Sequence, residues 1–258
     1  MSLTFIDFFA GVGGFRRGME LAGHKCVGFC EFDKYAVMSY TSMHLITDEQ
    51  RAYLETLSMR ERQKEILKEE YRNGEWFTDD IRRVYAGDIP KADVWCFGFP
   101  CQDISIAGNQ TGFQGNRSSL FFRVMYLLGQ IPEEKRPHTL FIENVKNLLS
   151  VNGGWDFARL LVEMDRGGYD AEWQVLNSKF FGVPQNRERV FVIGHLRRER
   201  NSARQVLSFK QGGGTCHQPN EAEKGIYEIA LCLTGKGSDR WVGSFVVEDE
   251  NPKNRKHI

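Results

Sequence analysis

The sequence predicts an α/β fold, in which a mostly parallel sheet is flanked by helices and followed by a small second region. The first observation is an apolar run at residues 3–9 that ends at a glycine turn, before helical spacing over 15–22. The second is an apolar run at 25–30 that precedes a helix-like stretch at 34–43. Two β-α units in succession favour parallel strands, because each helix must cross over the sheet before the next strand begins.

Further apolar runs extend the predicted sheet along the chain. They indicate strands at 94–97, 139–142, 173–176 and 190–193, with helices at 120–128 and 155–164. Residues 48–83 alternate in charge and carry apolar side chains at helical intervals, so we interpret them as an inserted helical excursion on the surface. From about residue 201 the composition shifts to short mixed runs rich in glycine, serine, threonine and asparagine. The sequence therefore predicts one large domain at 1–200 and a small, irregular region at 201–258.

Charge and hydropathy limit the kinds of partner. The 34 basic residues balance 34 acidic ones, so no overall positive field indicates a nucleic-acid partner. Residues 185–210 nevertheless contain seven basic and two acidic side chains, which make either a strip that faces phosphates or an ordinary solvated surface. No apolar run reaches the roughly 18 residues of a membrane span, and the first residues lack the basic flank of a signal peptide. We therefore expect a cytoplasmic protein with no membrane partner.

The cysteines do not predict a metal site. Six of them occur at positions 26, 30, 96, 101, 216 and 232, and no pair has the two-residue spacing of a zinc knuckle. Because no export signal is visible, we expect free thiols rather than disulfides, most of them small buried apolar groups.

The glycine turn at residues 9–14 is a candidate site for a nucleotide-like cofactor. Glycines let the backbone approach a ligand closely, and the amino terminus of the following helix favours negative charge. Glu31 closes the second strand about twenty residues later, where such folds place a carboxylate for ribose hydroxyls. A structural turn that binds nothing, or a nicotinamide site, would look similar. Nicotinamide is disfavoured, because the third glycine of its fingerprint would fall at Arg16.

Cys101 is a candidate nucleophile. It follows the predicted strand at 94–97, at the carboxyl end where open α/β sheets bind their ligands. Residues 103–119 contain three glycines and no long apolar run, which is typical of a mobile loop that closes over a substrate. The alternative, a buried structural thiol, suits a position inside the strand, such as Cys96.

Seven motifs, in order along the chain, resemble those of the DNA cytosine carbon-5 methyltransferases of bacteria and phages. The likeness extends over about residues 5–194, and a set in family order is far more specific than any single motif. The motifs lie at residues 7–16 (DFFAGVGGFR), 31–36 (EFDKYA), 87–89 (GDI), 98–102 (GFPCQ), 117–122 (RSSLFF), 143–145 (ENV) and 185–189 (QNRER).

The resemblance implies a Rossmann-like methyltransferase fold that uses S-adenosylmethionine and releases S-adenosylhomocysteine. By their matching positions, Glu31 is expected on the ribose and Asp88 with Ile89 beside the adenine. Leu120 is expected to add an apolar wall to the same pocket. The full set of expected cofactor-binding residues is Phe9, Ala10, Gly11, Val12, Gly13, Gly14, Glu31, Asp88, Ile89, Pro100 and Leu120.

The resemblance also implies covalent catalysis by Cys101, whose thiolate would attack carbon 6 of cytosine. Carbon 5 of the aromatic ring is a poor nucleophile, and addition of the thiolate converts it into an enamine-like centre. Electron density then moves to nitrogen 3 and oxygen 2, where an acid and cations stabilise it. Glu143 and Arg189 match those roles, with Arg187 as a companion. Without the resemblance, Asn144 could simply cap a helix and the two arginines could neutralise surface charge.

Double-stranded DNA is the implied partner, because the family acts on a base that must leave the duplex to reach the cysteine. We expect the loop at 103–118 to close on the DNA. The expected DNA contacts are Gln102, Ser105, Gln114, Arg117 and Ser118.

The match to the family pattern is incomplete at the end of the chain. Family members continue past a variable recognition region into two further motifs, the last of which completes the cofactor pocket. Here residues 231–238 resemble only part of a recognition region, so we interpret 201–258 as a partial target-recognition region. A further C-terminal segment or a complementary chain is therefore an expected partner.

Two other functions remain open at this point. RNA methylation occurs in one branch of the family, although that branch usually has proline where this chain has Phe99. A catalytically silent DNA-binding or cofactor-binding module would also fit the absence of the last motifs.

Overall fold

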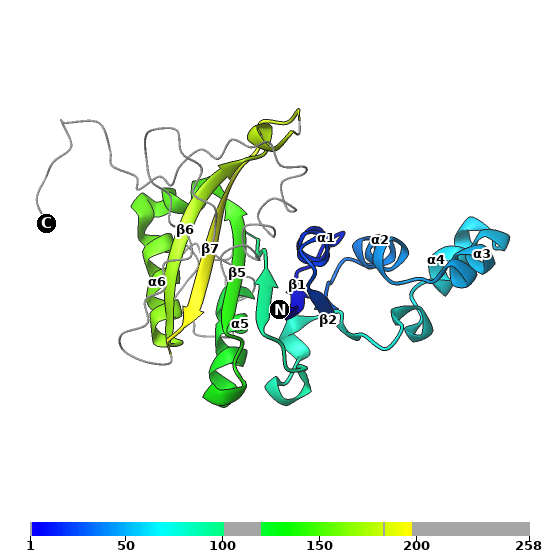
Figure 1. Ribbon diagram of the computed structural model, residues 1–258, viewed down its shortest axis with the longest axis horizontal. Helices are drawn as coiled ribbons and strands as arrows, with labels where there is room; N and C mark the ends of the chain where they lie inside the picture. Colours follow the sequence, from blue (N-terminus) through cyan, green and yellow to red (C-terminus); the bar gives the residue numbers. More distant parts are fainter. Residues whose placement is uncertain (1, 101–119, 183, 198–258) are drawn as a thin grey trace, which may run out of the picture.

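A mixed seven-stranded sheet forms the centre of the protein (Figure 1). The computed structural model describes residues 2–100, 120–182 and 184–197 of the 258. The strand order is β3-β2-β1-β4-β5-β7-β6. The strands are β1 (Thr4–Phe8), β2 (Lys25–Cys30), β3 (Trp76–Thr78), β4 (Val94–Phe97), β5 (Thr139–Val145), β6 (Tyr169–Asn177) and β7 (Glu188–Leu196). The α-helices are α1 (Gly14–Leu21), α2 (Lys34–His44), α3 (Asp48–Thr56), α4 (Met59–Glu65), α5 (Leu120–Gln130) and α6 (Trp155–Arg166).

The direction of the strands confirms the predicted, mostly parallel α/β fold. Strands β3, β2, β1, β4 and β5 run parallel, whereas β7 pairs antiparallel with both β5 and β6. The carboxyl ends of the parallel strands therefore meet at one edge of the sheet. Because β7 is reversed, its first residues lie at that same edge, and Arg189 is in register with Val145 at the end of β5. This edge brings together residues that are far apart in the sequence.

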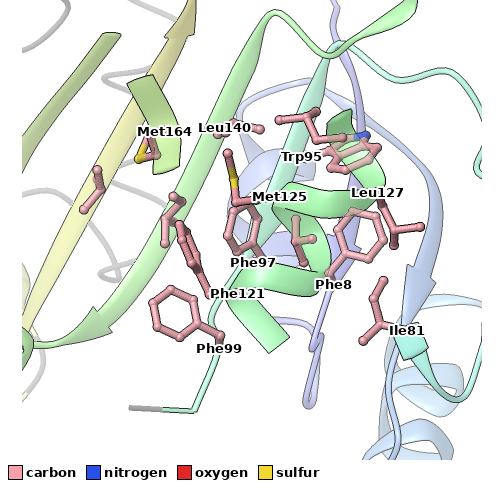
Figure 2. Close-up of a cluster of buried hydrophobic side chains, with 14 of the residues drawn as sticks. Phe8, Ile81, Trp95, Phe97, Phe99, Phe121, Met125, Leu127, Leu140 and Met164 are labelled. Atoms are coloured by element: carbon pink, nitrogen blue, oxygen red, sulfur yellow. The ribbon is translucent and has the colours of Figure 1, made fainter. Parts of the chain in front are cut away.

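Alternation along the strands divides the core between the two faces of the sheet. On one face, Phe8 and Phe97 belong to a large apolar cluster that α5 and α6 cover, as Figure 2 shows for Phe121 and Met164. On the other face, a smaller cluster of buried side chains packs against α1: Phe5, Met19, Cys26, Val94, Cys96, Phe141 and Ile193. Such a two-faced core is the expected consequence of helices lying on both sides of a parallel sheet.

The interpretation of residues 48–83 as a helical excursion is correct for its first part and wrong for its end. Helices α3 and α4 begin at capping boxes made by Thr47 with Gln50 and by Ser58 with Glu61, and Figure 1 shows both helices projecting beyond α2. The chain then returns to the sheet as β3, an edge strand paired with β2. A strand of three residues is too short to show a period of two.

Three of the expected free thiols lie in the described residues. Cys26, Cys30 and Cys96 are buried and unpaired, as the sequence predicts. Burial raises the pKa of Cys26 and of Cys30 to about 12, so neither is a thiolate at neutral pH. In the part of the chain that the structure describes, no helix is long and apolar enough to cross a membrane.

Candidate active site

The glycine turn between β1 and α1 has a backbone conformation that favours glycine. Phe9 has φ 56°, an unusual value for a residue with a side chain, and Gly11 and Gly13 have φ 55° and 88°. The amide of Gly13 donates to the Ala10 carbonyl at 2.8 Å, which closes the turn on itself. A Cβ added at Gly11 or Gly14 would meet no atom within 4 Å. The backbone at these two positions therefore faces space into which a ligand can approach.

Glu31 holds the turn through its carboxylate. Its Oε2 accepts a hydrogen bond from the Gly11 amide at 2.7 Å, and its Oε1 accepts from the Asp33 amide at 2.7 Å. The Ala10 amide donates to the carbonyl of Cys30, one residue before Glu31, at 3.1 Å. Parallel pairing of β1 with β2 brings the two segments together. The sequence predicts Glu31 near the turn, but not that it would be bonded to the turn's backbone.

Two of the remaining expected cofactor residues share one apolar environment. Ile89 is buried in the large cluster, and Leu120, at the start of α5, is partly buried against it. Asp88 ends a short 3-10 helix, Ala86–Asp88, and its side chain is exposed. The structure thus provides an apolar wall with a solvent-facing carboxylate next to it in the chain.

The segment that leads into Cys101 is fixed to the end of β5. Phe99 is buried and packs on Phe121, with ring centroids 5.2 Å apart. The Phe99 carbonyl accepts a hydrogen bond from Nδ2 of Asn144 at 2.8 Å. A Cβ added at Gly98 would lie 3.1 Å from Oε2 of Glu143, so this backbone runs directly beside that carboxylate. Pro100 is exposed.

Several expected site residues lie outside the described part of the chain. They are Cys101, Gln102, Ser105, Gln114, Arg117 and Ser118, together with the region at 201–258.

The alternative reading of Asn144 as a helix cap is wrong. The 3-10 helix that follows, Lys146–Leu149, begins after Val145 and has no side-chain cap. The Oδ1 of Asn144 accepts a hydrogen bond from the amide of Val145 at 2.9 Å, while its Nδ2 donates to the Phe99 carbonyl. Asn144 therefore ties the end of β4 to the end of β5.

Glu143 and Arg189 form an ion pair at this edge of the sheet. The Nε of Arg189 is 2.8 Å from Oε1 of Glu143, and both side chains are partly buried. Burial raises the pKa of Glu143, although the positive charges of Arg189 and, more weakly, Arg187 oppose the shift. Arg187 itself is exposed. A carboxyl group with a raised pKa can donate a proton, and an adjacent guanidinium can stabilise the carboxylate that remains.

One buried acid near the turn was not assigned a role from the sequence. Asp7 in β1 is 0% exposed, and its Oδ2 accepts from the Arg16 amide at 3.3 Å. Burial raises its pKa well above the ordinary value, and the nearby charge of Glu31 acts in the same direction. An acid inside an apolar strand, in Phe5-Ile6-Asp7-Phe8, is the signal that could have identified it.

Comparison with known proteins identifies one family and several relatives that are similar to this chain. Residues 3–55 and 51–231 match the family described as C-5 cytosine-specific DNA methylase. Type II methyltransferase M.HhaI of Haemophilus parahaemolyticus is 37% identical over 191 residues, which are 74% of this chain and 48% of that protein. Type II methyltransferase M.BsuFI of Bacillus subtilis is 34% identical over 75% of this chain and 39% of its own length.

A solved structure agrees at the level of the fold. The crystal structure of the Dnmt2 methyltransferase of S. pombe superposes with a TM-score of 0.54 at 18% identity, over 76% of this chain and 52% of that one. The chain spans about half the length, or less, of the curated relatives named above.

Proposed function

Because the chain belongs to the C-5 cytosine-specific DNA methylase family, we propose that it contributes the catalytic part of an enzyme that methylates carbon 5 of cytosine in DNA. The methyl donor in this proposal is S-adenosylmethionine, which the family uses. The partner is duplex DNA, from which the target base is flipped.

The pairing of Glu143 with Arg189 beside the backbone that leads into Cys101 is the observation that carries the proposal. The two charged groups are 2.8 Å apart, and Gly98 approaches Glu143 so closely that a side chain there would touch its carboxylate. Addition of a thiolate to a pyrimidine requires an acid that protonates the ring nitrogen, and Glu143, whose pKa is raised, lies beside the backbone that leads into Cys101.

The turn at residues 9–14 has the features that a bound adenosyl group needs. Open space at Gly11 and Gly14 lets the ligand reach the backbone, and the Glu31 carboxylate has lone pairs left for ribose hydroxyls. Ile89 and Leu120 offer an apolar surface for the adenine. When bound, S-adenosylmethionine supplies an electrophilic methyl group.

In the proposed reaction, the Cys101 thiolate forms a bond to carbon 6 of the cytosine. The electrons of the ring double bond move toward nitrogen 3, which takes a proton from the Glu143 carboxyl group. Arg189 then stabilises the Glu143 carboxylate and, with Arg187, the charge on oxygen 2. Carbon 5 becomes nucleophilic as a result. Loss of the carbon-5 proton to a base and departure of the thiolate later restore the aromatic ring.

Incubation with tritiated S-adenosylmethionine and cytosine-containing duplex DNA tests the proposal. We expect label at carbon 5 of cytosine, with little label in a transcript of the same sequence. In Cys101→Ser, turnover should fall by about a thousandfold or more, because a hydroxyl is a far weaker nucleophile than a thiol. The dissociation constant for S-adenosylmethionine should stay close to that of the wild type. Label on RNA alone, or none on DNA in a chain that includes the C-terminal motifs of the family, would overturn the proposal.

A further inference from the structure

The imidazole of His44, the last residue of α2, contacts the glycine turn from the side. Its Nε2 lies 2.9 Å from the carbonyl oxygen of Val12. The ring packs edge-on against Tyr40, with centroids 5.0 Å apart, and Tyr40 is fully buried and stacks on Phe29 of β2 at 3.9 Å. His44 is therefore supported by the core of the protein while its outer nitrogen reaches the turn.

The same imidazole fills the space where a side chain at Gly13 would lie. A Cβ added at Gly13 would overlap the ring of His44 and approach that of Tyr40. Gly13 also has φ 88°, which only glycine adopts without strain. The ring and the turn thus fit closely at two consecutive residues, through the carbonyl of Val12 and the α-carbon of Gly13.

The contact with the Val12 carbonyl determines the tautomer of His44. A carbonyl oxygen can only accept a hydrogen bond, so Nε2 of His44 must carry the hydrogen. Burial lowers the pKa of His44, although the hydrogen bond to Val12 and the charge of Glu20 oppose the shift, so the neutral ring is favoured near neutral pH. The neutral ring can donate from Nε2 only in the Nε2–H tautomer.

We propose that His44 is a positioning residue, which fixes the backbone of Val12 and Gly13 in the shape that receives the methyl donor; this inference rests on the proposed function. Val12 has an exposed side chain, 54% accessible, so packing does little to hold it. A hydrogen bond to its carbonyl restricts the turn before the ligand arrives. Restriction in the free protein lowers the entropy lost on binding and so strengthens binding.

Two substitutions and a control test this role. His44→Leu removes the donor and keeps an apolar side chain, whereas His44→Gln keeps an N–H donor on a chain of similar reach. Met43→Ala changes the neighbouring residue, which is 63% exposed. Calorimetry with S-adenosylmethionine should show the dissociation constant raised about five- to tenfold in His44→Leu, the worth of one neutral hydrogen bond. His44→Gln should recover most of the affinity, and Met43→Ala should match the wild type.

Steady-state kinetics should separate positioning from chemistry. In His44→Leu, KM for S-adenosylmethionine should rise by a similar factor, while kcat changes little because His44 touches no reacting atom. Equal affinity in all four proteins would overturn the inference and leave the proposed function intact. Failure of the wild type to bind S-adenosylmethionine, also when the chain is extended by the C-terminal motifs of the family, would overturn the proposed function, and the inference with it.

A measurement on the wild type covers the case in which His44→Leu does not fold. Long-range proton–nitrogen NMR spectra of the imidazole report which ring nitrogen carries the hydrogen. We expect the Nε2–H tautomer for His44. The Nδ1–H tautomer would leave the Val12 carbonyl without its donor and would contradict the proposal.

Discussion

The two halves of the candidate site are held together in different ways. Around β1 and β2, the polar contacts join side chains to backbone: Glu31 binds the amides of Gly11 and Asp33, and His44 binds the carbonyl of Val12. Around β5 and β7, the central contact joins two side chains, Glu143 and Arg189. The first half shapes a loop, whereas the second half sets the protonation of an acid.

The difference indicates which property of the site depends on each half. A carboxylate that binds two backbone amides preserves the shape of a turn, and its own protonation is secondary. For a partly buried acid beside a guanidinium, desolvation raises the pKa and the positive charge lowers it, and the balance decides when the acid gives up its proton. Substitutions in the two halves should therefore affect different steps, with ligand affinity changing in the first half and turnover in the second.

Among substitutions in the two halves, the largest effect is expected for Glu143→Gln. The amide keeps the shape of the carboxyl group but cannot supply a proton to nitrogen 3, so kcat should fall by about a hundredfold or more. Affinity for S-adenosylmethionine should not change. Glu172→Gln is a matched control, because Glu172 of β6 contacts Nε2 of His195 on β7 at 2.7 Å, near the end of β7 opposite to Arg189. Turnover in Glu143→Gln equal to that of the Glu172→Gln control would contradict the assignment.

A smaller effect, of the opposite kind, is expected for Glu31→Ala. Loss of the carboxylate frees the Gly11 amide and removes the expected acceptor for the ribose, so the dissociation constant for S-adenosylmethionine should rise about tenfold to a hundredfold. At saturating donor, kcat should stay close to the wild-type value. Asp33→Asn, which removes a charge two residues away and keeps an acceptor at the cap of α2, serves as the control. A fall in kcat alone would end the distinction between the two halves.

The first half of the site could largely be predicted from the sequence. The glycine turn and Glu31 each follow an apolar strand, and consecutive parallel strands bring their carboxyl ends together. Local pattern is sufficient there because β1 and β2 are neighbours both in the chain and in the sheet. What the sequence did not predict is the contact made by His44, since it depends on where α2 ends and how its last turn faces the loop.

The second half required information that no local pattern contains. Glu143 and Arg189 meet because β7 is antiparallel to β5, with Arg189 in register with Val145. A shift of one residue would turn Arg189 to the opposite face of the sheet. The resemblance to a family supplied both residues and their roles, but not their pairing. Strand β3 was missed for another reason: it is three residues long and stabilised by contacts such as Trp76 with Phe8, which are remote in sequence.

The smallest expected effect concerns Asp7, a buried acid of the first half whose pKa is raised, like that of Glu143, but which lies inside the fold. In the unfolded chain Asp7 has an ordinary pKa, so the folded protein binds the proton more tightly. Its contribution to the free energy of unfolding should then decrease as pH rises from the ordinary carboxyl range toward the raised value. Asp7→Asn removes this dependence, so the stability of the variant relative to the wild type should increase with pH over that range. The slope can reach about 1.4 kcal/mol per pH unit, the limit for one proton.

Urea unfolding at a series of pH values measures this slope, and a second acid provides a control of opposite sign. Partial burial raises the pKa of Asp93, but hydrogen bonds from the amide and hydroxyl of Thr4, both at 2.8 Å, bring it below the ordinary value. Asp93 therefore stabilises the fold above the ordinary carboxyl pKa and loses that effect as pH falls. The stability of Asp93→Asn relative to the wild type should decrease as pH rises, opposite to Asp7→Asn. Parallel slopes in the two variants would mean that burial does not control the Asp7 proton, and the same reasoning would then fail for Glu143.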